Sequence, residues 1–224
     1  MMETWTDFPF SIQIDDILRG QGMDPNSPRA RRPAFLQTAE IALELGFPLL
    51  QPSASVCEAR INDVRHERLL LEGGATLTGP LVSRILAGAE RIAAVVCTIG
   101  PGLEKLASEQ EDVLLGLAMD GLGNAAIEAV GQQVCARLAK EAQTHGLETS
   151  APLGPGEPDW SVGVGQPQLF GLFDPAPPGV RLAESGMMHP RKSISFVVGI
   201  GQHMEQVDLC ELCSLKERCH YRHA

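Results

Sequence analysis

One long helical segment constrains the fold of this 224-residue chain more than any other feature. Apolar residues recur at helical spacing from about Val113 to His145, and Gly146 provides a C-terminal stop. Four glycines interrupt this segment, and each costs helix stability relative to alanine: Gly116, Gly121, Gly123 and Gly131. We therefore expect these glycines to permit close packing against another backbone or a ligand.

Two other segments have the patterns of β-strands. Ile92 to Ile99 is a continuous apolar run followed by Gly100-Pro101-Gly102, which is typical of a buried strand. Ser193 to Ile200 alternates larger apolar residues with mostly small ones, which predicts a half-buried strand. Shorter patterns predict three further helices and one strand: helices over Ala34–Leu45, from Pro80 and over Leu103–Ser108, and a strand over Leu69–Leu71.

The overall charge argues against one large class of function. The chain has a formal net charge of −10 and a pI near 5.0, whereas a nucleic-acid-binding protein needs a basic surface. No stretch approaches the roughly 20 apolar residues of a membrane span, and the acidic N-terminus lacks the features of a signal peptide. We therefore expect a cytoplasmic protein that binds neither nucleic acid nor a membrane.

Cysteines near the C-terminus have the spacing of a metal site. Cys210 and Cys213 form a Cys-x2-Cys pair, and Cys219 and His223 follow. Thiolates at such spacing suit a [4Fe-4S] cluster or zinc. Zinc would take these four residues, whereas a cluster would take the three cysteines and one ligand from a wider set: His220, His223, Cys57, Cys97 or Cys135. The alternative is three free thiols in a loose tail.

The remaining cysteines carry no such pattern. In a cytoplasmic chain we expect cysteines to be thiols or ligands rather than disulfides. Cys97 falls in the predicted buried strand and Cys135 in the long helix. Both are therefore predicted to pack as small buried hydrophobic residues.

Three polar residues line one face of the predicted long helix. Asp120, Asn124 and Glu128 are spaced four residues apart, so their side chains lie above one another. Such a line is either a solvated face or the polar lining of a ligand site, and the spacing alone leaves both interpretations open.

An ordered set of short motifs gives the chain a family resemblance. The motifs are Asp120-Gly121-Leu122-Gly123 with Glu128-Ala129, then Pro155-Gly156, Leu182-Ala183-Glu184-Ser185, Met188-His189-Pro190 and Ser193-Ile194-Ser195. Over roughly residues 91 to 201 this order resembles the activation (reactivation) domain of cobalamin-dependent methionine synthase. The resemblance implies an α+β fold with a twisted, mainly antiparallel sheet and long helices. It suggests an N-terminal cap region at 1–90, a core at 91–203 and a cysteine-rich tail at 204–224.

The resemblance also implies a function. Domains of this family restore cobalamin from the inactive cob(II)alamin state by coupling a one-electron reduction to methyl transfer from S-adenosylmethionine. In this chain, Glu128 matches the family's acid that contacts the methyl donor. The expected ligand-binding residues are Asp120, Asn124, Glu128, Pro155, Gly156, Glu157, Glu184 and Ser185. No Asp-x-His-x-x-Gly run is present, so the cobalamin is expected to come from a corrinoid protein or corrinoid methyltransferase partner, or to bind directly and loosely.

Two departures from the family pattern leave donor binding open. The family has an arginine before the Pro-Gly step and a tyrosine after it, whereas here Pro152 and Glu157 occupy these places. An arginine would pair with the carboxylate of the donor. Two alternative functions therefore remain. One is a corrinoid-dependent methyltransferase with its ligand at Glu128, Glu157 and Glu184, and the other is a non-catalytic docking scaffold with a zinc-closed tail.

Overall fold

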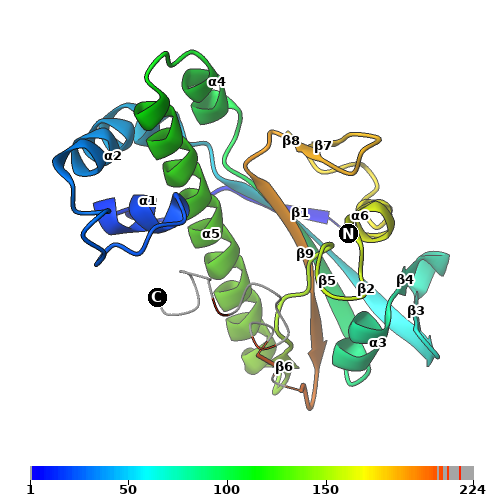
Figure 1. Cartoon of the computed structure of the whole chain (residues 1–224). Helices are drawn as coiled ribbons and strands as arrows, with labels where there is room; N and C mark the ends of the chain where they lie inside the picture. Colours follow the sequence, from blue (N-terminus) through cyan, green and yellow to red (C-terminus); the bar gives the residue numbers. More distant parts are fainter. Residues whose placement is uncertain (1, 206, 209–210, 212–216, 218–224) are drawn as a thin grey trace.

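The chain folds around one curled antiparallel sheet with helices on both faces (Figure 1). This computed structural model describes residues 2–205, 207–208, 211 and 217. The strands run in the order β4-β3-β2-β5-β9-β6, with β1 beside β2, and every paired strand is antiparallel. Their bounds are β1 Met2–Trp5, β2 Ser53–Arg65, β3 Arg68–Leu71, β4 Thr76–Thr78, β5 Arg91–Thr98, β6 Glu148–Thr149 and β9 Ser193–Gly201. The predicted α+β class with a mainly antiparallel sheet is confirmed.

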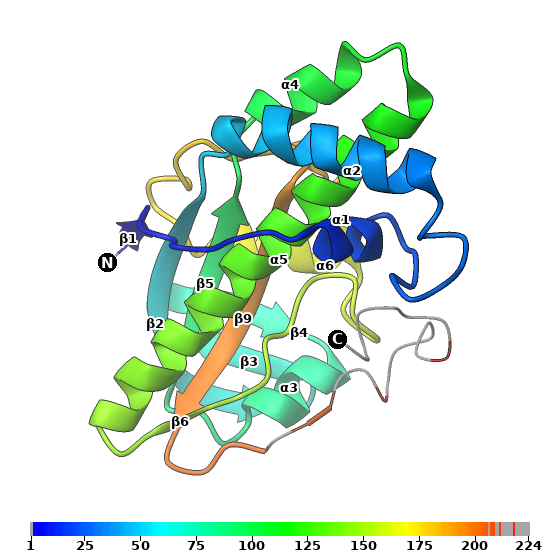
Figure 2. The same ribbon diagram turned by 90° about the vertical axis from the view of Figure 1, so that its left-hand side faces the viewer.

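The long helix lies along one face of the sheet, and two more helices cover its outer side (Figure 2). The helices on this face are α1 (Ile14–Gly20), α2 (Pro33–Gly46), α4 (Gly102–Ser108) and α5 (Val113–Thr144). The opposite face carries α3 (Pro80–Leu86) and α6 (Val162–Phe170). Short 3-10 turns occupy Phe47–Leu49 and Glu72–Gly74, and a separate small hairpin joins β7 (Arg181–Leu182) to β8 (Met188–His189).

Strand β5 is buried on both faces, as its continuous apolar sequence predicts. Ala93, Val95 and Cys97 point toward α5, while alternate residues point into a second apolar cluster with α3, β3 and β4. The predicted strand at Ser193 is likewise confirmed, although β9 is buried along nearly its whole length. The two clusters give the sheet an apolar layer on each side.

The glycines of α5 do not all have the same use. A Cβ atom on Gly121 would lie 2.6 Å from the carbonyl oxygen of Ile17 in α1. Gly123 and Gly131 face the side chains of Lys192 and Ile194, whereas nothing lies within 4 Å of a Cβ built on Gly116. The expectation of close packing is therefore confirmed at three positions, and against a backbone at Gly121 in particular.

Helix α5 meets the length and hydropathy of a membrane span, contrary to the expectation from the sequence. Half of its most apolar window is buried within the fold (50%), where it contacts α1, α2, β5 and β9. Small residues such as Ala118, Ala125 and Ala126 supply much of this buried face. The helix is therefore built as the core helix of a globular domain.

Strand β2 is the main element that the sequence patterns did not predict. It spans 13 residues and joins β1 and β3 on one side to β5 on the other. Its second half alternates half-buried residues with exposed charged or polar ones, such as Glu58 and Arg60. Prolines precede this strand in the sequence. Its charged residues make the alternation of half-buried and exposed positions hard to recognise, and the strand is stable only when it pairs within the sheet. Through β2, the N-terminal strands β1, β3 and β4 belong to the same sheet as β5, β9 and β6.

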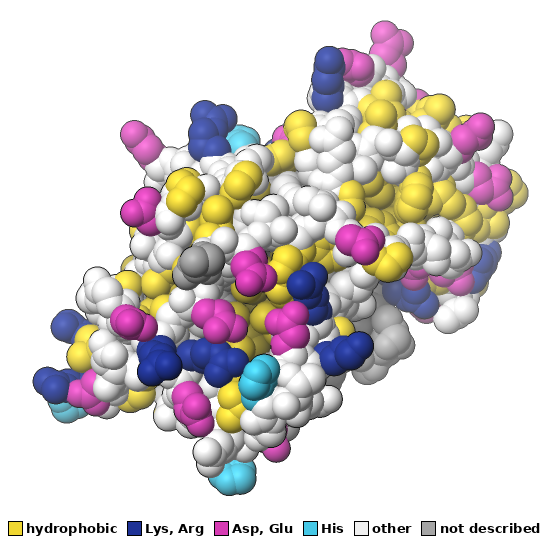
Figure 3. All heavy atoms as spheres, turned by 180° about the vertical axis from the view of Figure 1, so that it is seen from behind, with side chains coloured by type: hydrophobic (Ala, Val, Ile, Leu, Met, Phe, Trp, Pro, Cys, Tyr) yellow, Lys and Arg dark blue, Asp and Glu magenta, His cyan; other side chains and the backbone are white. Residues whose placement is uncertain are grey.

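The surface is uneven in character. Figure 3 shows hydrophobic side chains gathered at the end of the molecule that carries α2 and α4, and intermixed charges over the other half. Leu45, Phe47 and Leu49, where α2 ends, are between 36% and 48% exposed. Contiguous exposed apolar surface of this kind often marks a place where a partner binds.

Candidate functional site

The loop that contains the Pro-Gly step is held in one conformation by its neighbours. Leu153 forms a bridge with Val197 of β9, which fixes the start of the loop. Gly156 has a φ of 112°, a conformation that favours glycine, and its N–H donates to the carbonyl of Trp160 at 2.7 Å. Asp159 also has a positive φ, 63°, and the buried Trp160 anchors the end of the loop.

Gln168 of α6 ties this loop to strand β4. Its amide nitrogen donates to the Thr78 hydroxyl at 2.8 Å, and its amide oxygen accepts from the Thr78 N–H at 3.1 Å. The same oxygen accepts from Trp160 Nε1 at 3.2 Å. One side chain therefore connects α6, β4 and the loop, and it gives the space beside them a fixed wall.

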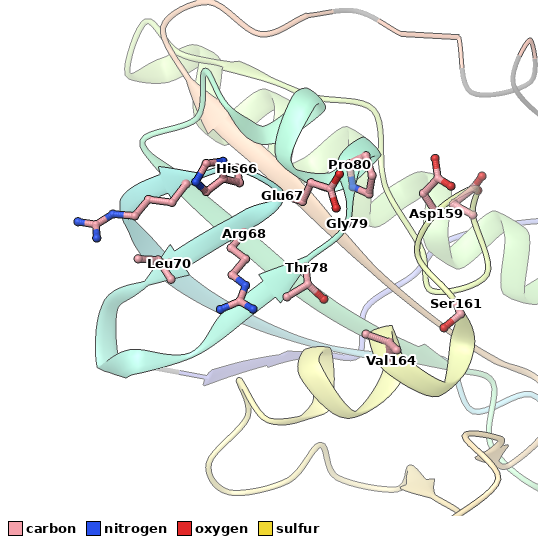
Figure 4. Close-up of a pocket in the computed structure, with 12 residues that line it drawn as sticks. His66, Glu67, Arg68, Leu70, Thr78, Gly79, Pro80, Asp159, Ser161 and Val164 are labelled. Carbon is pink, nitrogen blue, oxygen red and sulfur yellow. The ribbon is translucent and has the colours of Figure 1, made fainter.

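That space is a cleft of about 1180 Å3 between the β2–β3 hairpin, the end of β4, the loop and α6. We call it the loop cleft. Its lining is drawn in Figure 4 and consists of Arg65, His66, Glu67, Arg68, Leu70, Thr78, Gly79, Pro80, Glu157, Asp159, Ser161 and Val164. Cavities of this order hold small molecules in many proteins.

The loop cleft carries charges of both signs. In Figure 4, Glu67 and Asp159 lie on either side of Pro80, and Arg68 extends beside Thr78. Partial burial raises the pKa of the Glu157 carboxyl, the predicted site residue that lines this cleft. Within the described residues Arg68 has no carboxylate partner, whereas Arg65 pairs with Asp63. A ligand with separate cationic and anionic groups would match this arrangement.

Pro155 and Gly156, the two residues before Glu157, have structural contacts. Gly165 of α6 packs closely on Pro155, because a Cβ on this glycine would lie 2.9 Å from Pro155 Cβ. Gly156 makes the tight turn described above and is exposed. Pro155 and Gly156 therefore shape the loop that presents Glu157, and their assignment as binding residues stays a prediction.

The polar face of α5 is partly occupied by the chain's own cation. Lys192 Nζ lies 2.6 Å from Asp120 Oδ1 and 2.6 Å from Asn124 Oδ1, with its side chain only 18% exposed. Asn124 also donates to the Gly20 carbonyl at 2.8 Å. Asp120 and Asn124 therefore connect α5 to α1 and to the residue that precedes β9, and Asp120 has less free charge for a cationic ligand than the sequence suggested.

Glu128 lies one turn further along α5 in a different cavity, of about 410 Å3. Ser11, Asp16 and Arg19 share this lining, and Gln132 donates to Glu128 Oε1 at 3.1 Å. Glu184 and Ser185 are exposed in the turn between β7 and β8, where the Ser185 hydroxyl accepts from the Met187 N–H at 3.5 Å.

The predicted site residues therefore do not gather in one cavity. Among the described cavities none is lined by two of Glu128, Glu157 and Glu184, because α5, the loop and the hairpin turn face different parts of the surface. Sequence reasoning also missed Arg68 and Asp159, which reach the loop cleft from β3 and from the loop. No local signal marks Arg68, since only the fold of the β2–β3 hairpin brings it to the cleft.

The predicted metal ligands lie outside the described residues: Cys210, Cys213, Cys219 and His223. The metal site therefore stays a prediction, and the part of the chain that is described contains no metal-binding group of three His, Cys, Asp or Glu residues. Cys97 is fully buried, and burial raises its thiol pKa far above the ordinary value. Burial also raises the pKa of Cys135 to about 11, although this residue is only half-buried. The prediction of a small buried residue is therefore confirmed for Cys97 and only in part for Cys135.

Comparison with known proteins shows a similarity of structure but not of sequence. The sequence matches no protein-family model and no curated protein sequence. The crystal structure of the MetH reactivation domain bound to AdoHcy (S-adenosylhomocysteine) is similar over 100% of this chain and 86% of that chain, with a TM-score of 0.62. Sequence identity is 12%, so the relation is one of fold.

Proposed function

We propose that this chain is an accessory factor for a corrinoid-dependent methyltransferase system and restores the cobalamin of its partner. The observation that carries the proposal is the fold match over the whole chain with a reactivation domain that holds AdoHcy. AdoHcy is what S-adenosylmethionine becomes after it gives up its methyl group. A chain that binds the donor beside a partner's corrinoid would make methyl transfer effectively intramolecular.

The loop cleft is the proposed site of the methyl donor. S-adenosylmethionine carries a sulfonium and an ammonium group, which suit the carboxylates of Glu67, Glu157 and Asp159. Its carboxylate suits a planar guanidinium, and Arg68 lacks a carboxylate partner within the described residues. Arg68 would thereby replace the arginine that the family pattern has where this chain has Pro152.

Binding of AdoHcy to a matched pair of variants tests this assignment. By isothermal titration calorimetry, Arg68→Gln should weaken AdoHcy binding by about tenfold or more, since a hydrogen bond to a charged group contributes about 1.5–3 kcal/mol. Arg60→Gln removes the same charge from an exposed position on β2 outside the cleft, and should leave the affinity unchanged. Equal losses in the two variants would contradict the assignment.

The reaction proposed for this site needs one electron, which a reductant of low potential supplies. Cob(II)alamin gains one electron from the reductant and becomes cob(I)alamin. The cobalt electron pair then attacks the methyl carbon of S-adenosylmethionine, and the carbon–sulfur bond breaks. The products are methylcobalamin and AdoHcy, with the electron pair of the broken bond left on sulfur.

For the C-terminal tail we propose a [4Fe-4S] cluster held by Cys210, Cys213 and Cys219 with a fourth ligand such as His223. A cluster there would supply electrons, whereas zinc on the same residues would be a structural clamp. Iron, acid-labile sulfide and zinc per chain, measured after purification without oxygen, decide between them. About four iron and four sulfide per chain support the cluster, and stoichiometric zinc would overturn it.

A second candidate function is a docking scaffold without a ligand of its own. The Lys192–Asp120 ion pair favours it, because this cation occupies part of the polar face that the sequence assigned to a ligand. The exposed Leu45, Phe47 and Leu49 would then serve a protein partner. Absence of AdoHcy binding together with zinc in the tail would support the scaffold over the reactivation factor.

A further inference from the structure

A second concave region lies between α4 and the β7–β8 hairpin, apart from the loop cleft. Two cavities, of about 550 and 810 Å3, both have Glu104 and Ser108 of α4 in their linings and therefore adjoin. The first reaches Met119 of α5, and the second reaches Pro190 after β8. We call the combined region the hairpin groove.

Cationic side chains surround the hairpin groove. Lys105 comes from α4, Arg181 from β7 and Arg191 from the segment after β8. His189 lies opposite Arg181 in the hairpin register. Across the described part of the chain, Lys105, Arg181 and Arg191 form no ion pair with a carboxylate. Such a cluster is unexpected on a chain with a net charge of −10.

The carboxylates of the hairpin groove are already engaged. Asp120 accepts the Lys192 ammonium at 2.6 Å, which neutralises both groups. Glu104 Oε2 accepts the Arg191 backbone N–H at 2.8 Å, so this carboxylate is directed to the backbone. The groove therefore presents more free positive than negative charge to a ligand.

Between these charges the groove is apolar and rich in methionine. Met187 and Met188 contribute accessible side chains to its lining, together with Ala107, whereas Met119 and Leu103 border it but are buried. Met187 is 50% exposed, which leaves its flexible side chain free to cover a ligand. Methionine sulfur makes favourable contacts with aromatic rings, and the unbranched side chain adapts to their shape.

The geometry points to the hairpin groove as a binding site for a mononucleotide, with the base against Met187 and Met188 and the phosphate near Lys105, Arg181 and Arg191. Guanidinium and ammonium groups are the usual partners of phosphate. The volumes of the two cavities are within the range of small-molecule sites. This site is separate from the proposed donor site, because the two linings share no residue.

Calorimetric titration with AMP, adenosine and inorganic phosphate tests the inference. AMP should bind more tightly than either adenosine or phosphate, since it alone contacts both parts of the groove. The double variant Lys105→Gln/Arg181→Gln should weaken AMP binding by about tenfold or more, because it removes two charge-assisted contacts. The control Arg84→Gln/Lys140→Gln lowers the net charge equally on exposed parts of α3 and α5 and should bind AMP like the unmodified chain.

Three results would overturn the inference: equal affinity for AMP and adenosine, phosphate binding as tight as AMP binding, or equal losses in the two double variants. Met187→Ala should weaken the binding of AMP and of adenosine to the same extent. An unchanged affinity for both ligands would contradict the proposed contact between the base and Met187. AdoHcy titrated into the Lys105→Gln/Arg181→Gln protein should bind as before, which separates this site from the loop cleft.

Discussion

The close contact between α1 and α5 allows us to predict how one added methyl group changes the stability of the fold. A Cβ on Gly121 would lie 2.6 Å from the Ile17 carbonyl oxygen and 2.7 Å from Gln21 Cγ. A Cβ on Gly20 would lie only 2.1 Å from the Gly121 carbonyl oxygen, so the two helices meet backbone to backbone. Gly121→Ala therefore forces a helix to move, because a carbonyl oxygen cannot rotate away as a side chain can.

The size of the effect follows from two opposing contributions. Overpacking of a close contact costs about 1–3 kcal/mol. Alanine in place of glycine within a helix returns roughly 1 kcal/mol through its higher helix propensity. We expect Gly121→Ala to lower the free energy of unfolding by up to about 2 kcal/mol, which corresponds to a melting temperature lower by up to about 8 °C in a chain of this size.

Gly116 supplies the matched control on the same helix. Nothing lies within 4 Å of a Cβ built there, so Gly116→Ala should gain up to about 1 kcal/mol from propensity alone. Urea denaturation followed by far-UV circular dichroism measures both variants against the unmodified chain. If Gly121→Ala proves as stable as Gly116→Ala, the close α1–α5 contact is refuted.

Three further predictions concern the loop cleft and the core. Gln168→Leu leaves Thr78 and Trp160 without their partner and should lower the free energy of unfolding by about 1–3 kcal/mol in urea denaturation; an unchanged value would refute the anchoring role. Burial raises the folded-state pKa of Glu157, so its contribution to stability is present at acidic pH and lost as pH rises through that pKa. Glu157→Gln should therefore be the more stable protein at neutral pH, with the difference shrinking on acidification, and a difference that grows on acidification would reverse the sign. Because the Cys135 pKa is raised to about 11, iodoacetamide at neutral pH should leave it unmodified in the folded chain, as mass spectrometry of tryptic peptides would reveal. Rapid alkylation of Cys135 in the folded chain would contradict the raised pKa.

The elements predicted from the sequence are those whose pattern is complete within one segment. The apolar run of β5 and the spacing of α5 carry their own evidence, since burial on both faces and a helical stripe are visible in the order of residues. Strand β2 was missed because half of it is stable only through its partners β1, β3 and β5. In the sequence alone, its charged residues give no pattern of a buried strand.

In the candidate site, too, some residues could be predicted from the local sequence and others could not. Glu157 could be singled out from its place beside Pro155-Gly156, and it does line the largest of the described cavities. Arg68 could not be, because it is distant in sequence and reaches the cleft only through the β2–β3 hairpin. Likewise, the spacing of Asp120 and Asn124 showed that they share a helix face. It did not show that Lys192, the residue before β9, contacts both of them.

The proposed function is tested most directly by the rate of methylcobalamin formation without oxygen. A corrinoid protein that carries cob(II)alamin is mixed with S-adenosylmethionine and Ti(III) citrate, with and without the full chain, and the methylcobalamin absorption is followed. The reactivation role predicts that the chain raises the initial rate by about tenfold or more, as expected when two reactants are held together, and that Arg68→Gln loses most of the increase. A rate that is the same with and without the chain would contradict it.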